Sequence, residues 1–262
     1  MPKYLKIEIT KDGVYKISLN RPDIHNAFND EMILEITDVF SKVDSRNDIN
    51  LIVLTGEGRS FCAGADLNWM KSMIGYSEKE NFEDSKKLAK MFSTINNCLK
   101  PILGVINGHA LGGGVGLVSV CDYVMTHSKA KFGFTETRLG LVPAVISPYC
   151  INKIGESHAR AWFLSGEMFS ADMAQKMNLI HEVCELDSFE EKINSRIDTF
   201  LKAGPNAAIE AKKLIKNIFS LEKKQIEDYT CKAISERRVS KEGQEGMNAL
   251  LEKRKPNWIK ND

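Results

Sequence analysis

The residues that could most clearly take part in catalysis form two short glycine-bearing turns. These are residues 61–66 (Phe-Cys-Ala-Gly-Ala-Asp) and residues 109–114 (His-Ala-Leu-Gly-Gly-Gly). Each turn falls where an extended apolar run gives way to a helical pattern. A peptide N–H at a helix start has no partner within the helix, so two such turns facing each other can hold one developing negative oxygen. The candidate donors are the backbone amides of Ala65 and Gly113. The alternative is that these glycines only permit tight turns or close helix packing.

Glu136 is the candidate acid and base. It follows an aromatic and small-residue stretch, residues 132–135, so a partly buried carboxyl group with a raised pKa is predicted. Taken alone, a glutamate in such a place is more often a solvated surface residue. His25 and His109 lie in the same regions without an obvious Cys or Ser partner, and a structural role is predicted for both.

Strand and helix patterns alternate along the first part of the chain. Residues 5–10 and 14–19 predict a hairpin, and Asn29 predicts the N-cap of a helix that ends near Ser45. A capping-box pattern predicts another helix after Ser77. Buried-type strands are predicted at residues 51–55, 102–106 and 123–125. This alternation indicates an α/β fold.

The later part of the chain has a helical pattern. From Ala159 onward we expect the strands to stop. Helices are predicted at residues 159–164, 171–177, 189–201 and 205–217.

Composition excludes several classes of protein. The 262 residues carry 36 Lys and Arg against 35 Asp and Glu, a net charge of +1, so no global field favours nucleic acid or an anionic membrane. Six scattered cysteines predict free thiols in a reducing compartment and no metal site. The chain opens without a signal or transit pattern, and no apolar run approaches the ~20 residues of a membrane span. The expected location is the cytoplasm.

Five segments in register resemble the crotonase (enoyl-CoA hydratase/isomerase) superfamily, and the resemblance covers nearly the whole chain. They are residues 20–27, 61–67, 107–114, 132–143, and 242–246 with 253–256. The resemblance implies a spiral of ββα turns in residues 1–200. It also implies a C-terminal helical region, residues 201–262, that builds homotrimers, usually paired into homohexamers. Such a scaffold hosts several reactions, so it specifies the fold better than the product.

The same resemblance implies an acyl-CoA substrate whose thioester oxygen lies between the amides of Ala65 and Gly113. Coenzyme A is then part of the substrate, so no separate cofactor and no metal are expected. The segments implied to line the CoA arm are those around Arg21, Ala27, Ala63, Asp66 and Leu67.

One departure from the family pattern bears on the reaction. Typical hydratases of this family carry two glutamates, whereas this chain has Gly116 at the first place and Glu136 at the second. Residues 22–28, 66–71, 114–117 and 141–149 are similar to the bacterial branch acting on 3-methylglutaconyl-CoA or related branched enoyl-CoAs, which shares this loss. We expect Gly116 to leave room beside the β-carbon for a methyl branch. Lys71 and Arg138 are the candidate cations for a distal carboxylate, or they are solvated surface charges.

The leading hypothesis is hydration of a branched enoyl-CoA with Glu136 as acid and base. An enoyl-CoA isomerase is the first alternative, because one carboxylate suffices to carry a proton between two carbons. RNA binding as a secondary role is the second alternative, suggested by basic pairs near the C-terminus. These pairs alternate with glutamates, so nucleic acid is not the expected partner.

Overall fold

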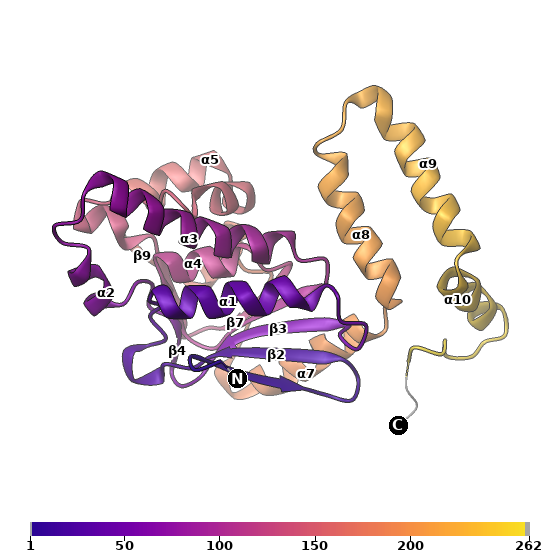
Figure 1. The fold of residues 1–262 in the computed structure, drawn as a ribbon. Coiled ribbons are helices and arrows are strands. Elements are labelled where there is room, and N and C mark those ends of the chain that lie inside the picture. Colours follow the sequence, from indigo (N-terminus) through magenta and orange to yellow (C-terminus); the bar gives the residue numbers. More distant parts are fainter. Residues whose placement is uncertain (1, 260–262) are drawn as a thin grey trace.

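A large sheet runs through the lower part of the view in Figure 1, with helices packed on both of its faces. The computed structural model describes residues 2–259. The six strands lie in the order β1-β2-β3-β5-β7-β10. β1 and β2 pair antiparallel, and the remaining neighbours pair parallel. Their bounds are β1 (Leu5–Ile9), β2 (Val14–Leu19), β3 (Leu51–Gly56), β5 (Ile102–Ile106), β7 (Tyr123–His127) and β10 (Glu182–Cys184). The predicted hairpin and the three buried strands are confirmed.

A second, smaller sheet carries the candidate site at its strand ends. Its order is β4-β6-β8-β9, with β9 antiparallel to β8. The bounds are β4 (Ser60–Cys62), β6 (His109–Leu111), β8 (Lys131–Gly133) and β9 (Met168–Ser170). The chain repeatedly passes from a strand of the large sheet to a strand of the small one and then into a helix. Ala65, Gly113 and Glu136 therefore follow the carboxyl ends of three neighbouring parallel strands.

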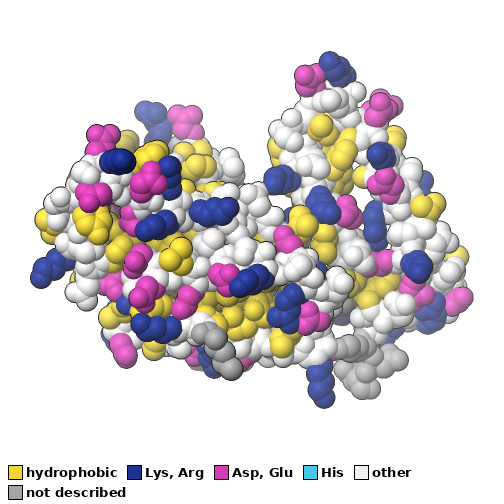
Figure 2. Space-filling view, viewed as in Figure 1, with side chains coloured by type: hydrophobic (Ala, Val, Ile, Leu, Met, Phe, Trp, Pro, Cys, Tyr) yellow, Lys and Arg dark blue, Asp and Glu magenta, His cyan; other side chains and the backbone are white. Residues whose placement is uncertain are grey.

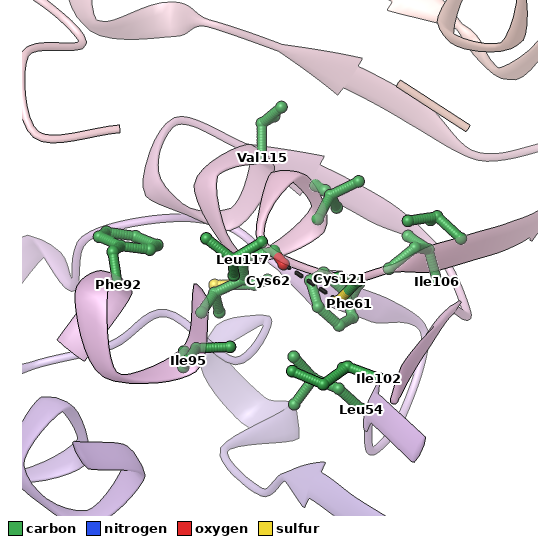
Figure 3. Close-up of a cluster of buried hydrophobic side chains, with 14 of the residues drawn as sticks. Leu54, Phe61, Cys62, Phe92, Ile95, Ile102, Ile106, Val115, Leu117 and Cys121 are labelled. Carbon is green, nitrogen blue, oxygen red and sulfur yellow. Dashed lines mark hydrogen bonds between the residues drawn. The ribbon is translucent and has the colours of Figure 1, made fainter. Parts of the chain in front are cut away.

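The helices of the first part pack on the large sheet around one apolar core. Asn29 caps α1 (Asp30–Val43) by accepting a 3.0 Å hydrogen bond from the Met32 amide. Ser77 and Glu80 form the predicted capping box of α3 (Glu78–Asn97). The shorter helices are α2 (Leu67–Ser72) and α4 (Gly113–Ser119). Figure 3 shows part of the core, in which Phe61 and Leu117 belong to the same buried cluster as Leu54 and Ile102 of the sheet.

The prediction that strands stop at Ala159 is wrong. β9 pairs with β8, and β10 extends the large sheet beside β7. Each has only three residues, too few to display an alternating pattern, and each forms because a neighbouring strand offers an unpaired edge. Helix α5 (Ser147–Ser165) precedes β9, α6 (Ala171–Lys176) lies between the two strands, and α7 (Phe189–Leu201) follows β10. Short 3-10 turns lie at Pro22–Ile24 before α1, at Thr135–Leu139 after β8, and at Leu186–Ser188 before α7. The α/β fold class is confirmed.

Three C-terminal helices stand apart from the sheets as an arm (Figure 1). The arm consists of α8 (Pro205–Ile218), α9 (Lys223–Val239) and α10 (Lys241–Leu251). Glu242 of α10 accepts hydrogen bonds from the amides of Asn206 and Ala207, at 3.0 and 2.7 Å, and so caps the start of α8. Lys212 anchors α8 to the rest of the molecule through a 2.6 Å ion pair with Asp122.

Two further observations concern the molecule as a whole. Nowhere in residues 2–259 is a helix long and apolar enough to cross a membrane. All six cysteines are free.

Candidate active site

The first glycine turn is held by Phe28. The Phe28 amide donates to the Gly64 carbonyl at 2.8 Å, and the Phe28 carbonyl accepts from the Asp66 amide at 3.0 Å. In this parallel bridge Ala65 is the residue opposite Phe28, so its own N–H points to the other side. The Ala65 N–H donates no hydrogen bond within the described part of the chain. It is available to a ligand.

The second glycine turn begins α4. The Gly112 amide donates to the Gly133 carbonyl at 2.8 Å, and Gly112 has φ +50°, a conformation that suits glycine. The next amide, that of Gly113, has no hydrogen-bond acceptor among residues 2–259, as expected for the first residue of a helix. A Cβ placed on Gly64 would lie 3.6 Å from the Gly113 nitrogen. The two turns, 49 residues apart from Gly64 to Gly113, therefore meet, and each supplies an unengaged N–H.

Glu136 lies over the second turn. It sits in the 3-10 turn after β8, and a Cβ placed on Gly112 would lie 3.2 Å from its Oε1. Its Oε2 is buried and has no hydrogen-bond partner within residues 2–259. Burial raises the pKa of this carboxyl group. A partly buried carboxylate with an unused oxygen is suited to moving a proton.

The surroundings of Gly116 differ from the expectation. A Cβ placed on Gly116 would lie 2.3 Å from Cγ2 of Ile146 and 2.8 Å from Cζ of Phe92. The space that a side chain at residue 116 would need is thus already filled by two apolar side chains. The prediction that Gly116 leaves an open pocket for a methyl branch is wrong. The sequence showed only the absent glutamate. Ile146, which fills the space, precedes α5 as its N-cap residue and lies 30 residues further along the chain.

Arg21 and Asp66 form an internal ion pair beside the first turn. Arg21 Nη2 contacts Asp66 Oδ2 at 2.7 Å, and Arg21 Nη1 donates to the Ala27 carbonyl at 2.6 Å. Asp66 also caps α2 through the Asn68 amide. Although burial opposes it, these hydrogen bonds hold the pKa of Asp66 below its usual range. The structure thus gathers Arg21, Ala27 and Asp66 beside the Ala65 turn, with two guanidinium nitrogens already engaged.

The remaining predicted residues lie around this centre. Ala63 donates its amide to the His25 carbonyl at 2.9 Å, which ties the same two segments together. Leu67 starts α2 and is 81% exposed. Lys71, on α2, and Arg138, in the 3-10 turn of Glu136, are exposed, and neither forms an ion pair with any described residue.

The two histidines of the motifs have structural partners. His25 Nδ1 lies 2.9 Å from Ser60 Oγ, and His109 Nδ1 accepts the Lys131 amide at 3.0 Å. Across residues 2–259, no group of three or more His, Cys, Asp or Glu is placed to hold a metal ion.

Sequence reasoning missed Phe28. Its ring is 1% exposed, and its Cζ would lie 2.3 Å from a Cβ placed on Gly113. The same residue whose main chain holds the Ala65 turn therefore contacts the Gly113 turn with its side chain. Its place at the edge of a family motif was the only signal in the sequence.

Comparisons with known proteins match nearly the whole chain. A sequence model of the enoyl-CoA hydratase/isomerase family matches residues 9–261. The crotonyl-CoA hydratase of Syntrophomonas wolfei is 30% identical over 243 residues, which cover 92% of each chain. The mitochondrial enoyl-CoA hydratase of Pongo abelii is 31% identical over 92% of this chain and 82% of its own. A crystal structure of an enoyl-CoA hydratase from Shewanella pealeana superposes with a TM-score of 0.92 at 34% identity, covering 98% of this chain and 97% of that one.

Proposed function

This chain belongs to the enoyl-CoA hydratase/isomerase family of the crotonase superfamily, and we propose that it hydrates a branched α,β-unsaturated acyl-CoA to the 3-hydroxyacyl-CoA. Enoyl-CoA hydration is supported at a general level by the family and by relatives named for that activity. The branched, 3-methylglutaconyl-like acyl group and the roles of individual residues are the finer parts of the proposal.

The thioester oxygen is proposed to bind between the amides of Ala65 and Gly113. Neither N–H group donates a hydrogen bond within residues 2–259, and the two turns meet. Two such donors stabilise the negative charge that develops on the oxygen when the β-carbon is attacked, and removing one donor typically costs about 3–4 kcal/mol of barrier. Coenzyme A enters as part of the substrate, and the proposed reaction uses no separate cofactor.

Glu136 is proposed to serve as both base and acid. Its carboxylate takes a proton from water while the water oxygen bonds to the β-carbon, which gives an enolate held by the two amides. The proton then passes from Glu136 to the α-carbon, and the carboxylate is regenerated. The observation that carries this proposal is the buried Oε2 of Glu136, which has no hydrogen-bond partner in the described part of the chain. Burial raises the carboxyl pKa towards the range useful for proton transfer.

The branched acyl group is supported by the resemblance of residues 22–28 and 141–149 to hydratases of branched substrates. Because Ile146 and Phe92 fill the space at Gly116, a methyl branch would lie against these apolar side chains and not in a hole at Gly116. Lys71 and Arg138 remain the proposed partners of a distal carboxylate.

Isomerisation of a 3-enoyl-CoA is the second candidate reaction. It is favoured by the apolar contacts of Gly116 with Ile146 and Phe92, which occupy the place of a second glutamate. A single carboxylate can shuttle one proton between two carbons without activating water.

Product analysis separates the two reactions. The purified protein is incubated with crotonyl-, 3-methylcrotonyl- and 3-methylglutaconyl-CoA and with a 3-enoyl-CoA, beside Glu136→Gln. Hydroxyacyl products from the branched substrates support the hydratase proposal. Conversion of only the 3-enoyl-CoA to its 2-enoyl isomer would support the isomerase, and equal turnover by Glu136→Gln would remove Glu136 from either mechanism.

The arm is proposed to assemble the chain into homotrimers or homohexamers. Large apolar side chains lie exposed along it, and Figure 2 shows hydrophobic patches on the arm among charges of both signs. They are Ile215, Phe219, Ile234, Val239, Met247, Leu250 and Leu251. Nucleic acid is not a proposed partner, because basic side chains of this region form ion pairs with acidic ones. Examples are Lys213 with Glu210 and Arg254 with Glu245.

A further inference from the structure

Phe28 connects the two proposed amide donors. Its main chain makes both hydrogen bonds of the bridge to the Ala65 turn, at 2.8 and 3.0 Å. Its ring points tip-first at Gly113, because Cζ would lie 2.3 Å and Cε1 3.0 Å from a Cβ placed there. One buried residue thus stands between the turn that carries the first N–H and the turn that carries the second.

The position of Phe28 is itself fixed on both sides. Its ring packs edge-on against Trp69 of α2, with ring centroids 6.2 Å apart. Its segment is tied down by Arg21, which donates to the Ala27 carbonyl and pairs with Asp66. The Arg21 amide also donates to the Asn26 side chain at 2.8 Å. A ring held in this way acts as a rigid spacer.

We propose that Phe28 is a positioning residue that sets the separation between the Ala65 and Gly113 amides. The inference rests on the proposed function, in which both amides bind one thioester oxygen. Donors of this kind act only when each lies about 2.7–3.1 Å from the charged oxygen. A shorter side chain at residue 28 removes the contact with Gly113, and a longer one pushes Gly113 away.

The absent side chain at residue 113 follows from the same contact. Gly113→Ala keeps the N–H but forces a Cβ against the ring of Phe28. If the contact sets the spacing, shortening residue 28 should partly rescue Gly113→Ala. A purely local effect of the alanine would not be rescued.

A bound chromophore provides the test, because a conjugated dienoyl-CoA absorbs at longer wavelength when its carbonyl is polarised. The red shift, kcat and KM for an enoyl-CoA are measured for the wild type, Phe28→Leu, Phe28→Tyr, Gly113→Ala and the double variant Gly113→Ala/Phe28→Leu. Phe40→Leu is the control, since Phe40 is equally buried, at 1% exposed, but lies in the last turn of α1, 12 residues after Phe28. Folding of each variant is checked by circular dichroism and thermal melting.

Phe28→Leu and Phe28→Tyr are expected to reduce the red shift and to lower kcat roughly 10- to 100-fold with little change in KM, because misplacement of a donor affects the transition state most. The double variant is expected to exceed Gly113→Ala in both red shift and kcat. Phe40→Leu is expected to melt earlier yet keep the full red shift.

The possible failures are distinguishable. A wild-type protein that binds the dienoyl-CoA without any red shift would overturn the proposed binding of the thioester oxygen by the two amides, and the inference with it. A wild type with the shift, together with folded Phe28 variants that retain both the shift and kcat, would overturn the inference alone. Failure of Phe28→Leu to rescue Gly113→Ala would also contradict it.

Discussion

The carboxylate of Glu136 lies on the side of Gly112 where a side chain would stand, because a Cβ placed on Gly112 would come within 3.2 Å of Oε1. The amide that follows, that of Gly113, is one of the two unengaged donors. Glu136, the proposed base, therefore contacts Gly112, and the next residue of the same turn, Gly113, carries one proposed oxyanion donor.

Glu136→Gln is expected to lower kcat by roughly 10²–10⁴-fold, the range of general acid–base catalysis. The thermal midpoint should not fall, because a buried neutral amide is less penalised than a buried unpaired carboxylate. Steady-state hydration and thermal melting measure the two effects. Glu167→Gln, which alters an exposed glutamate, should leave kcat unchanged. Equal loss of activity in both variants would contradict the role of Glu136.

The pH dependence of stability gives a second test of Glu136. Burial raises its pKa in the folded protein above the ordinary 4.5, so the folded state binds this proton more tightly than the unfolded state. This tighter proton binding adds to the free energy of unfolding below pH 4.5, and the added stability is lost as the pH rises through the raised pKa. Denaturant titrations should show wild type losing stability relative to Glu136→Gln across this window. The acid limb of kcat/KM should likewise lie above the ordinary glutamate range. A stability difference that does not vary with pH would contradict the burial of this carboxylate.

Gly116 gives a third prediction. Gly116→Ala should lower the free energy of unfolding by about 1–3 kcal/mol, the usual effect of overpacking a core, because its Cβ meets Cγ2 of Ile146 at 2.3 Å. Gly116→Glu should be less stable still and should not gain hydratase activity. Urea unfolding measures both variants. Ile146→Ala removes the clashing atom, so the double variant with Gly116→Ala should be more stable than the sum of the single effects predicts. Additive losses would argue against this contact.

The elements around the site could be predicted where the signal was local. Asn29 and Ser77 predict the starts of their helices, which their side chains cap. The glycine turns after apolar runs indicated the amides of Ala65 and Gly113 as candidate donors. Features that depend on distant packing could not be predicted. β9 and β10 exist only because other strands offer edges, and a sequence does not show that Ile146 fills the space beside Gly116.

The arm gives a fourth prediction, on assembly. Leu250 and Leu251 are 79% and 80% exposed in the single chain, so their replacement by glutamate should shift the protein from trimers or hexamers towards monomers. Light scattering coupled to size exclusion measures the mass. Ile9→Glu, on β1 and outside the arm, is the control and should leave the mass unchanged. A wild-type protein that is monomeric at micromolar concentration would contradict the proposed role of the arm.

Arg21 could serve the structure through its ion pair or bind the CoA arm of the substrate, and the two roles make different predictions. Its guanidinium pairs with Asp66 and donates to the Ala27 carbonyl. In the ion pair the side chain of Arg21 is 15% exposed and that of Asp66 is 8% exposed. Arg21→Lys cannot reproduce both contacts, so the free energy of unfolding should fall by up to about 3 kcal/mol, the lower range for a broken buried pair. KM for an acyl-CoA should change little. If Arg21 instead binds the CoA arm directly, KM should rise and depend on salt while stability is retained. Arg46→Lys, which alters the more exposed pair with Asp48, provides the matched control and should cost less than about 1 kcal/mol.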